Sequence, residues 1–176
     1  SGQLQSENIT GMHWYEYIGG SLYNRTDVIQ FPEQPASYII FNRSGTVYVK
    51  NGTTGQIDYT ATSNAALAIQ FAIDSFPAGN YKIALSSGLY QTSGPITITD
   101  QSNVTIAGQG ASTVIEAQTN NFKIFNIAFS VSGHYNIRLR DLQIRCKETL
   151  TPANGNYGIY LDAADHGFHH AFVQNC

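Results

Sequence analysis

The chain has 176 residues, a length that supports one domain with its own core and an additional extension. Charged residues make up 12% of the chain, about half of the usual share, and the formal net charge is -3. The absence of a basic run argues against nucleic acid as a partner, and no apolar stretch approaches the ~18 residues that a membrane span needs. The 16 Gly, 11 Tyr and 9 Phe favour a β-rich globular protein over a disordered chain or a helical bundle.

Five N-x-[ST] sequons indicate a secreted glycoprotein. The sequence starts without the basic and apolar regions of a signal peptide, which fits a processed, mature form. A chain rich in Asn, Ser and Thr also produces such triplets by chance, so an unglycosylated protein remains the alternative. We expect an extracellular or cell-surface location, with glycosylation at Asn8, Asn24, Asn42, Asn51 and Asn103.

The N-terminal third of the chain divides into two parts. Residues 1–36 keep neither a helical nor a strand period and are predicted to form an extended arm or linker. Their aromatic residues would be unusual in a solvated linker, so the arm is expected to lie against its own domain or a neighbour. Residues 37–62 alternate short apolar runs with Asn-rich and Gly-rich turns, which predicts a small β-meander. Its three strands are expected at 38–41, 46–50 and 56–59.

A single helix is predicted after the meander, at the start of a third segment, residues 63–176. Apolar residues recur at spacings of three and four between Ala65 and Phe76, and a proline and a glycine follow directly. Thr62 or Ser63 is the expected N-cap, because a hydroxyl at this position accepts a hydrogen bond from the first turn. Few polar residues lie on the other face, so the helix should be half buried.

The segment beyond residue 81 contains short apolar alternations that return at a long, uneven period. The segments that begin at Asn103, Asn136 and Asp165 superpose when these three residues are aligned in one column. In this superposition the next column holds Val104, Ile137 and His166, and a later one holds Gly108, Asp141 and His170. Repeated short strands of this kind are typical of a solenoid, whose coils stack about 4.8 Å apart and bury a narrow core together.

The order of these segments resembles the N-terminal part of right-handed parallel β-helix proteins of the pectate lyase superfamily. The resemblance rests on the helix followed by G-L-Y at 88–90, G-P-I-T-I at 94–98 and N-V-T-I-A-G-Q-G at 103–110. The segment 46–59 is similar to archaeal surface proteins and virus-associated proteins of this type. The resemblance covers residues 38–176 and implies an all-β, right-handed parallel β-helix with an N-terminal capping helix and a preceding β-meander.

The resemblance also supplies tests for enzymatic activity. Hydrolases of this superfamily carry Asn-Thr-Asp, Asp-Asp, Gly-His-Gly and Arg-Ile-Lys elements, and none of these occurs in the sequence. Its calcium-dependent lyases need several acidic ligands and a catalytic arginine, whereas Arg138, Arg140 and Arg145 have no acidic cluster beside them in the sequence. We therefore expect no cofactor and no resident metal, and calcium only if the protein is an enzyme.

The best candidate for chemistry is a small group of acidic and histidine residues near the C-terminus: Asp162, Asp165, His166, Asp141 and His170. One hypothesis is a metal or acid-base site, because Asp141 and His170 share a predicted column. The favoured hypothesis is a structural ladder, in which His170 satisfies Asp141 and His166 fills a core position.

Two cysteines, Cys146 and Cys176, fall one predicted coil apart, with Cys146 nearly in the column of Asn175. Adjacent coils bring backbones within disulfide range, so we predict a bond between them in an oxidising exterior. The alternative is two buried thiols.

The sequence ends directly after a predicted strand. The chain is then a fragment of a longer solenoid, or its last coil is covered by a neighbouring subunit, or the disulfide and a loop cover it. The second option predicts a homo-oligomer or filament, joined head to tail through the N-terminal arm and the open coil.

Three functions remain open at this point. The first is a non-catalytic extracellular glycoprotein domain with a structural or adhesive role in a surface layer, an appendage or a virion. The second is the N-terminal part of a polysaccharide lyase or glycoside hydrolase. The third is a carbohydrate-binding module, in which exposed aromatic side chains stack on a polysaccharide.

Overall fold

The computed structural model describes residues 14–18, 21–25, 36–76, 79–120, 123–129, 136–147, 157–162 and 170–176, with the backbone alone for the first two ranges and for residues 170 and 171. The chain forms two compact units, Ser1–Gln34 and Pro35–Cys176. The predicted boundaries after residues 36 and 62 stay a prediction.

The first unit contains a β-hairpin where the sequence predicted an extended arm. Strands β1 (Trp14–Ile18) and β2 (Ser21–Arg25) pair antiparallel, with Trp14 opposite Arg25. The two strands flank the Gly19-Gly20 pair that interrupts the aromatic run in the sequence.

The second unit begins with an antiparallel meander. Its strands are β3 (Tyr38–Arg43), β4 (Thr46–Asn51) and β5 (Ile57–Thr62). Ser44 and Gly45 both take positive φ angles, 52° and 83°, which the tight β3-β4 reversal requires. The three strands confirm the meander that the sequence predicts.

The remaining strands form three coils and the start of a fourth. They are β6 (Tyr81–Leu85), β7 (Gly88–Thr92) and β8 (Ile96–Thr99), then β9 (Val104–Ala107), β10 (Thr113–Ala117) and β11 (Lys123–Ala128), then β12 (Asn136–Arg140), β13 (Gln143–Cys146) and β14 (Tyr157–Asp162), and finally β15 (His170–Gln174). Equivalent strands of successive coils pair in parallel and in register.

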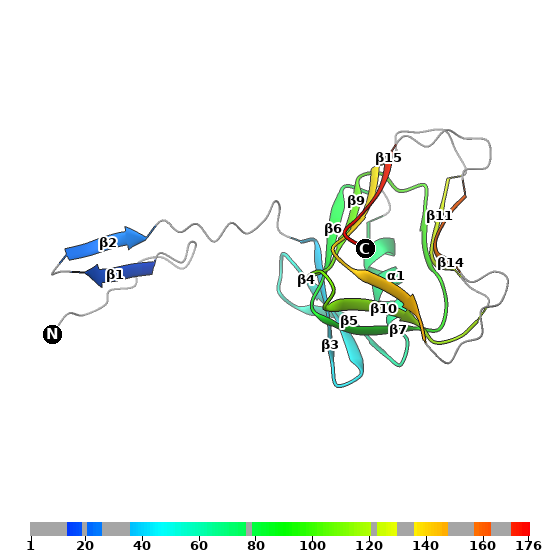
Figure 1. Ribbon diagram of the computed structural model, residues 1–176, viewed down its shortest axis with the longest axis horizontal. Helices are drawn as coiled ribbons and strands as arrows, with labels where there is room; N and C mark the ends of the chain where they lie inside the picture. Colours follow the sequence, from blue (N-terminus) through cyan, green and yellow to red (C-terminus); the bar gives the residue numbers. More distant parts are fainter. Residues whose placement is uncertain are drawn as a thin grey trace. The chain divides into compact units, whose positions relative to one another are not determined.

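This stacking builds three sheets around one core, two of them parallel throughout and the third mixed (Figure 1). Two have three strands each, in the orders β13-β10-β7 and β14-β11-β8. The third has seven, in the order β15-β12-β9-β6-β3-β4-β5, because β3 pairs parallel to β6 and joins the meander to the coils. The fold is a parallel β-helix preceded by a β-meander, as the sequence predicts.

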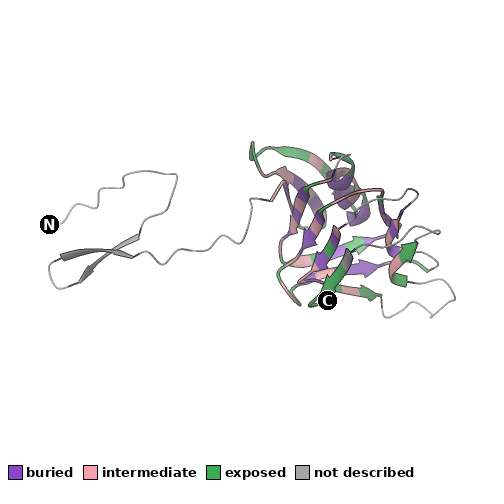
Figure 2. Cartoon of the chain, turned by 90° about the horizontal axis from the view of Figure 1, so that it is seen from above, coloured by how far each residue is buried: buried purple, intermediate pink, exposed green. Residues whose placement is uncertain are grey.

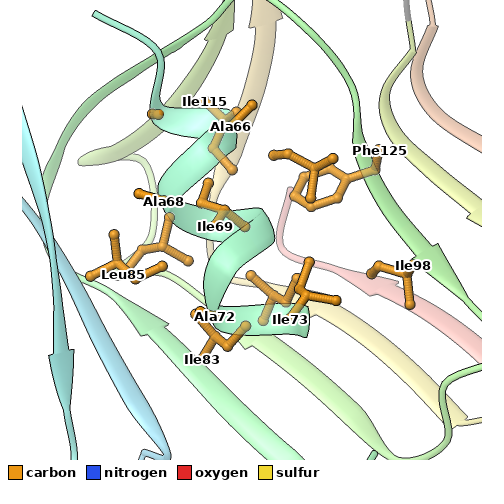
Figure 3. Close-up of a cluster of buried hydrophobic side chains, with 14 of the residues drawn as sticks. Ala66, Ala68, Ile69, Ala72, Ile73, Ile83, Leu85, Ile98, Ile115 and Phe125 are labelled. Atoms are coloured by element: carbon orange, nitrogen blue, oxygen red, sulfur yellow. The ribbon is translucent and has the colours of Figure 1, made fainter. Parts of the chain in front are cut away.

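Helix α1 (Ala65–Asp74) packs into the first coil. Its apolar face, which includes Ile69 and Ile73, is buried against side chains from the surrounding strands, among them Ile83 and Phe125 (Figure 3). The N-cap is Asn64, whose Oδ1 accepts a hydrogen bond from the Ala66 N-H at 3.1 Å, so the predicted hydroxyl cap is wrong. Within the described part of the chain, no helix is long and apolar enough to cross a membrane.

Polar side chains of the helix region also close the open edges of the first coil. The Gln70 amide pairs with both backbone groups of Thr97 in β8: its Oε1 accepts from the Thr97 N-H at 2.7 Å, and its Nε2 donates to the Thr97 carbonyl at 3.0 Å. Asn64 Oδ1 accepts a second hydrogen bond, from the Ser93 N-H that follows β7. Together with the β3-β6 pair, these contacts satisfy backbone groups that a first coil would otherwise leave unpaired.

The core follows the alternation of the strands. Inward residues such as Ile83, Ile106 and Leu139 stack along one sheet and are almost fully buried (Figure 2). Gly108 lies where two coils approach closely: a Cβ at this position would lie 2.3 Å from the carbonyl oxygen of Asp141, so glycine is required.

An asparagine ladder lies at the corner that precedes the strands of the seven-stranded sheet. Asn103 Nδ2 donates to Asn80 Oδ1 at 2.8 Å, and Asn136 Nδ2 donates to Asn103 Oδ1 at 3.3 Å. Asn80 and Asn103 have positive φ angles of 60° and 55°, which asparagine tolerates better than most residues. The ladder and the pairing of Val104 with Ile137 confirm the predicted alignment of the segments that begin at Asn103 and Asn136.

The second predicted alignment is wrong. Asn136 pairs with His170, and Ile137 with Ala171, so β15 begins later in the sequence than the segment that was expected to stack there. The sequence placed Asp165 and His166 at these positions, because the side loops between strands vary in length and a short alternation fits more than one register.

Candidate functional site

The predicted pair of Asp141 and His170 does not form. Asp141 Oδ1 accepts a hydrogen bond from Asn175 Nδ2 at 2.9 Å, and His170 lies opposite Asn136 at the other end of β12. The corrected register explains the difference: Asn175, and not His170, is the residue that stacks on Asp141. This corner is therefore an amide-carboxylate ladder.

The other predicted candidates are not brought together in the described residues. Asp162 ends β14 and is exposed, and Asp165 and His166 lie outside the described residues. Among the residues that the structure describes, no group of three His, Cys, Asp or Glu side chains could hold a metal ion. A catalytic role for Asp162, Asp165 or His166 stays a prediction.

The predicted disulfide is absent. Cys146 and Cys176 are free and exposed. Cys146 pairs with Ala117 at the end of β13, whereas Cys176 follows β15 in a different sheet, where its thiol contacts the Leu139 carbonyl at 3.7 Å. The prediction was wrong because it used the incorrect alignment of the last coil, which placed the two cysteines in neighbouring columns.

Three of the five sequons lie in described residues with described side chains, and each asparagine amide has an intramolecular hydrogen-bond partner. Asn42 Nδ2 donates to the Leu89 carbonyl at 2.6 Å, Asn51 Nδ2 to Asp58 Oδ2 at 2.9 Å, and Asn103 Nδ2 to the ladder. Glycosylation attaches through this same nitrogen. The described sequons therefore have structural roles, and their glycosylation stays a prediction, as it does at Asn8 and Asn24.

A polar column crosses the outer face of the β13-β10-β7 sheet. Gln91, Glu116 and Arg145 are directly opposite one another in register. Arg145 donates to Glu116 Oε2 through both Nε and a terminal nitrogen at 2.8 Å, and Gln118 Nε2 donates to Oε1 at 2.7 Å. Sequence reasoning missed this column, because its members are far apart along the chain and belong to no motif.

Glu116 is 7% exposed yet remains ionised at neutral pH. Burial by itself raises the pKa of the carboxyl group, but hydrogen bonds from Gln118, Arg145 and Gln91 and the arginine charge outweigh it and hold the pKa below its usual value. A carboxylate with a lowered pKa is a poor general acid near neutral pH. The column therefore serves to tie three coils together.

Two tyrosines lie on the outer side of the β14-β11-β8 sheet. Tyr157 and Tyr160 have ring centroids 5.5 Å apart, and Lys123 places its ammonium group 3.1 Å from the Tyr160 centroid. The lysine covers one ring face of Tyr160, whereas Tyr157 is 48% exposed. Exposed and partly exposed aromatic side chains such as these are the sugar-stacking candidates that the sequence predicts, but the sequence gave no sign of the lysine.

The outermost described strands carry inward-facing apolar side chains that nothing covers. In β15, Val173 stacks on the buried Leu139 and is 51% exposed. In β14, Leu161 stacks on the buried Ile127 and is also exposed. Figure 2 shows the strand that leads to the C-terminus coloured as exposed. We call the surface formed by β13, β14 and β15 the end face.

The strands of the end face also have backbone N-H and C=O groups with no neighbouring strand among the described residues to pair with. Within the described residues, β13, β14 and β15 are each the last strand of their sheet. The opposite end differs, because β3 pairs with β6, Gln70 bonds to both backbone groups of Thr97 in β8, and Asn64 accepts from the Ser93 N-H after β7. The two ends of the coil stack are therefore chemically unlike: one, which we call the closed end, is partly capped by α1 and β3, and the other is open to further strands.

Comparisons with known proteins give no identification. The chain matches no protein-family model, no curated protein and no solved structure.

Proposed function

We propose that the chain is a structural domain that acts outside the cell or at its surface and assembles with other β-structure through its end face. The observation that carries the proposal is the exposure of Val173 and Leu161, which occupy core columns but lie on strands with a free edge. Apolar side chains beside unpaired strand edges favour the addition of further strands. The five sequons support the extracellular location.

The partner that we propose for the end face is the N-terminal hairpin of a second copy. Strands β1 and β2 form a two-stranded sheet, so within the described residues each has one free edge that can pair with another strand. The capping end of a second copy is a poorer partner, because Gln70, Asn64 and β3 already occupy part of its edges. This contact is head to tail and propagates as a filament.

Membership of the pectate lyase superfamily is part of this proposal. The parallel sheets, the capping helix and the asparagine ladder support it. The likeness to archaeal surface and virus-associated proteins favours the structural role over catalysis.

A lysine at Val173 tests the assembly. The charge would lie in the end face, so we expect Val173→Lys to reduce the self-association of the intact chain by at least tenfold in light scattering coupled to size-exclusion chromatography. Leu67→Lys is the matched control: Leu67 has the same exposed fraction, 51%, but lies on α1 at the closed end. It should leave self-association unchanged.

Trp14 reports on the partner, because it is the single tryptophan of the chain and lies in β1. If the hairpin packs on a neighbour, its fluorescence emission shifts to the blue as the concentration of the intact protein rises, and Val173→Lys abolishes the shift. A chain that remains monomeric at high micromolar concentration would contradict the proposal. Association without a Trp14 shift would exclude the hairpin as the occupant of the end face.

A further inference from the structure

Four basic side chains from distant parts of the sequence lie on the outer face of the seven-stranded sheet. Each alternates with a buried residue of its own strand, such as Val49, Ile83 or Ile137, and therefore points away from the core. We call this surface the basic face and define it by Lys50, Lys82, Arg138 and Arg140.

The strand register fixes how these side chains are distributed. Lys82, Thr105 and Arg138 lie in one row across β6, β9 and β12, which places the Cα atoms of the two basic residues about 9.6 Å apart. The next row begins with Lys50 on β4 and ends with Arg140 on β12, about 19 Å away. Small or aliphatic residues fill the positions between them: Ile39, Ala84 and Ala107. The cations are therefore spread in two dimensions and do not follow one line.

Within the strands of this sheet, basic residues outnumber acidic ones. The seven strands contain five Lys or Arg residues, counting Arg43, and a single carboxylate, that of Asp58. Asp58 accepts hydrogen bonds from Tyr38 and Asn51. Next to the sheet, Asp141 lies 3.9 Å from Arg140. The sheet is net positive, although the whole chain has a formal charge of -3.

Aromatic side chains accompany the cations. Arg138 Nε donates to Asn136 Oδ1 at 3.2 Å, and its guanidinium group lies 5.7 Å from the ring centroid of Phe172, which is half exposed. Phe41 and Tyr48 stack on each other on the same outer side of β3 and β4, with centroids 5.1 Å apart. Cations with long apolar stems and partly exposed aromatic rings are typical of surfaces that meet the headgroup region of a bilayer.

We propose that the basic face binds the surface of an anionic phospholipid bilayer and holds the β-helix flat against it. A planar array of headgroup phosphates complements cations that are spread over two dimensions, whereas a single linear polyanion could contact only one row at a time. The attachment is peripheral and electrostatic. This inference goes beyond the proposed assembly and does not depend on it, because the basic face and the end face use different residues.

Vesicle co-sedimentation of the intact chain tests the proposal. We expect binding to vesicles of phosphatidylglycerol and phosphatidylcholine, little binding to vesicles of phosphatidylcholine alone, and loss of binding at 0.5 M salt, because salt screens exposed charges. The double variant Lys82→Gln, Arg138→Gln should bind about 25-fold more weakly, since each cation near an anionic surface strengthens binding about fivefold.

The matched control is Lys123→Gln, Lys147→Gln, which removes the same charge from residues outside the basic face. It should retain most of the binding, and circular dichroism should show that both double variants are folded. Equal losses in the two variants, or no binding to phosphatidylglycerol vesicles, would overturn the proposal. Binding to a sulfated polysaccharide that is tighter than binding to vesicles would also overturn it, in favour of a glycan ligand.

Discussion

Glu116 shows how a single side chain can join successive coils. It receives hydrogen bonds from Arg145 on one neighbouring strand and from Gln91 on the other, so one carboxylate connects β7, β10 and β13. A buried charge is costly unless its hydrogen-bonding capacity is filled, and here both of its oxygens have partners. The stability of the stack should therefore depend on the ionisation of this residue.

We expect Glu116→Gln to lower the free energy of unfolding by about 1 to 2 kcal/mol at pH 7, because it removes a charge-assisted pair. The folded pKa of Glu116 lies below its ordinary value of 4.5, so the pair stabilises the fold above that value and loses its effect as the pH falls through the folded pKa. Urea unfolding at pH 7 and at the lowest pH at which both proteins still fold measures this, and the gap between variant and wild type should be smaller at the acidic pH. Asp162→Asn, at an exposed carboxylate, is the control; a gap of equal size at both pH values would contradict the account.

At the scale of elements, helix α1 replaces a missing coil. Its alanines and isoleucines fill the end of the core, and Gln70 supplies the donor and acceptor that a neighbouring strand would offer to Thr97. The sequence predicts the helix from its apolar spacing, but the role of Gln70 depends on a residue 27 positions away. The N-cap was missed for a local reason: Ser63 has a φ of 65°, and Asn64 takes the extended conformation that an N-cap needs.

Replacing Gln70 by alanine should lower the free energy of unfolding by about 1 to 3 kcal/mol, because two part-buried backbone groups of Thr97 lose their partners. Thermal and urea unfolding measure the loss. The control is Leu67→Ala on the exposed side of the same helix, which should change stability by less than about 0.5 kcal/mol. Similar losses in both variants would mean that helix propensity, and not the edge contact, determines the effect.

At the scale of the whole molecule, the two ends of the coil stack differ in how well their strands are paired and buried. Strands β6, β9, β10, β11 and β12 have strand partners on both sides, whereas β13, β14 and β15 have described partners on one side only. Strands β7 and β8 also end their sheets, but they lie against α1. Their inward side chains are also more exposed than those of the coils before them. Local stability should therefore fall along the chain.

Amide hydrogen exchange on dilute protein tests this gradient. We expect the amides of β6 and β9 to exchange at least a hundredfold more slowly than those of β15, because opening β15 breaks one strand interface and exposes little new apolar surface. At concentrations where the end face is covered, β15 should gain protection and β9 should change little. Uniform exchange across all the coils would show that the stack opens as one unit.

The sequence predicts the fold because strand alternation, turn residues and the asparagine column repeat in the first coils. Val104 and Ile137 are equivalent apolar residues at equivalent positions, so their pairing could be inferred. The predicted register of β15 was wrong, because the alignment matched the polar Asp165 to the column of Asn103 and Asn136, which placed His166 in an apolar column that Ala171 fills in the structure. The contacts of Glu116 and the grouping of the basic face could not be predicted from the sequence for a related reason. Their residues are far apart in the chain and become neighbours only when the strands pair.

The contact between Gln70 and Thr97 also bears on the order in which the protein folds during synthesis. Strand β3, helix α1 and the contact between Gln70 and Thr97 all lie between residues 36 and 102. The capped first coil can therefore form before the third coil has left the ribosome. Each later strand then pairs with a strand that is already folded, and this partner sets its register. The direction of translation and the direction of stacking coincide, which limits the time that a newly made strand spends without a neighbour.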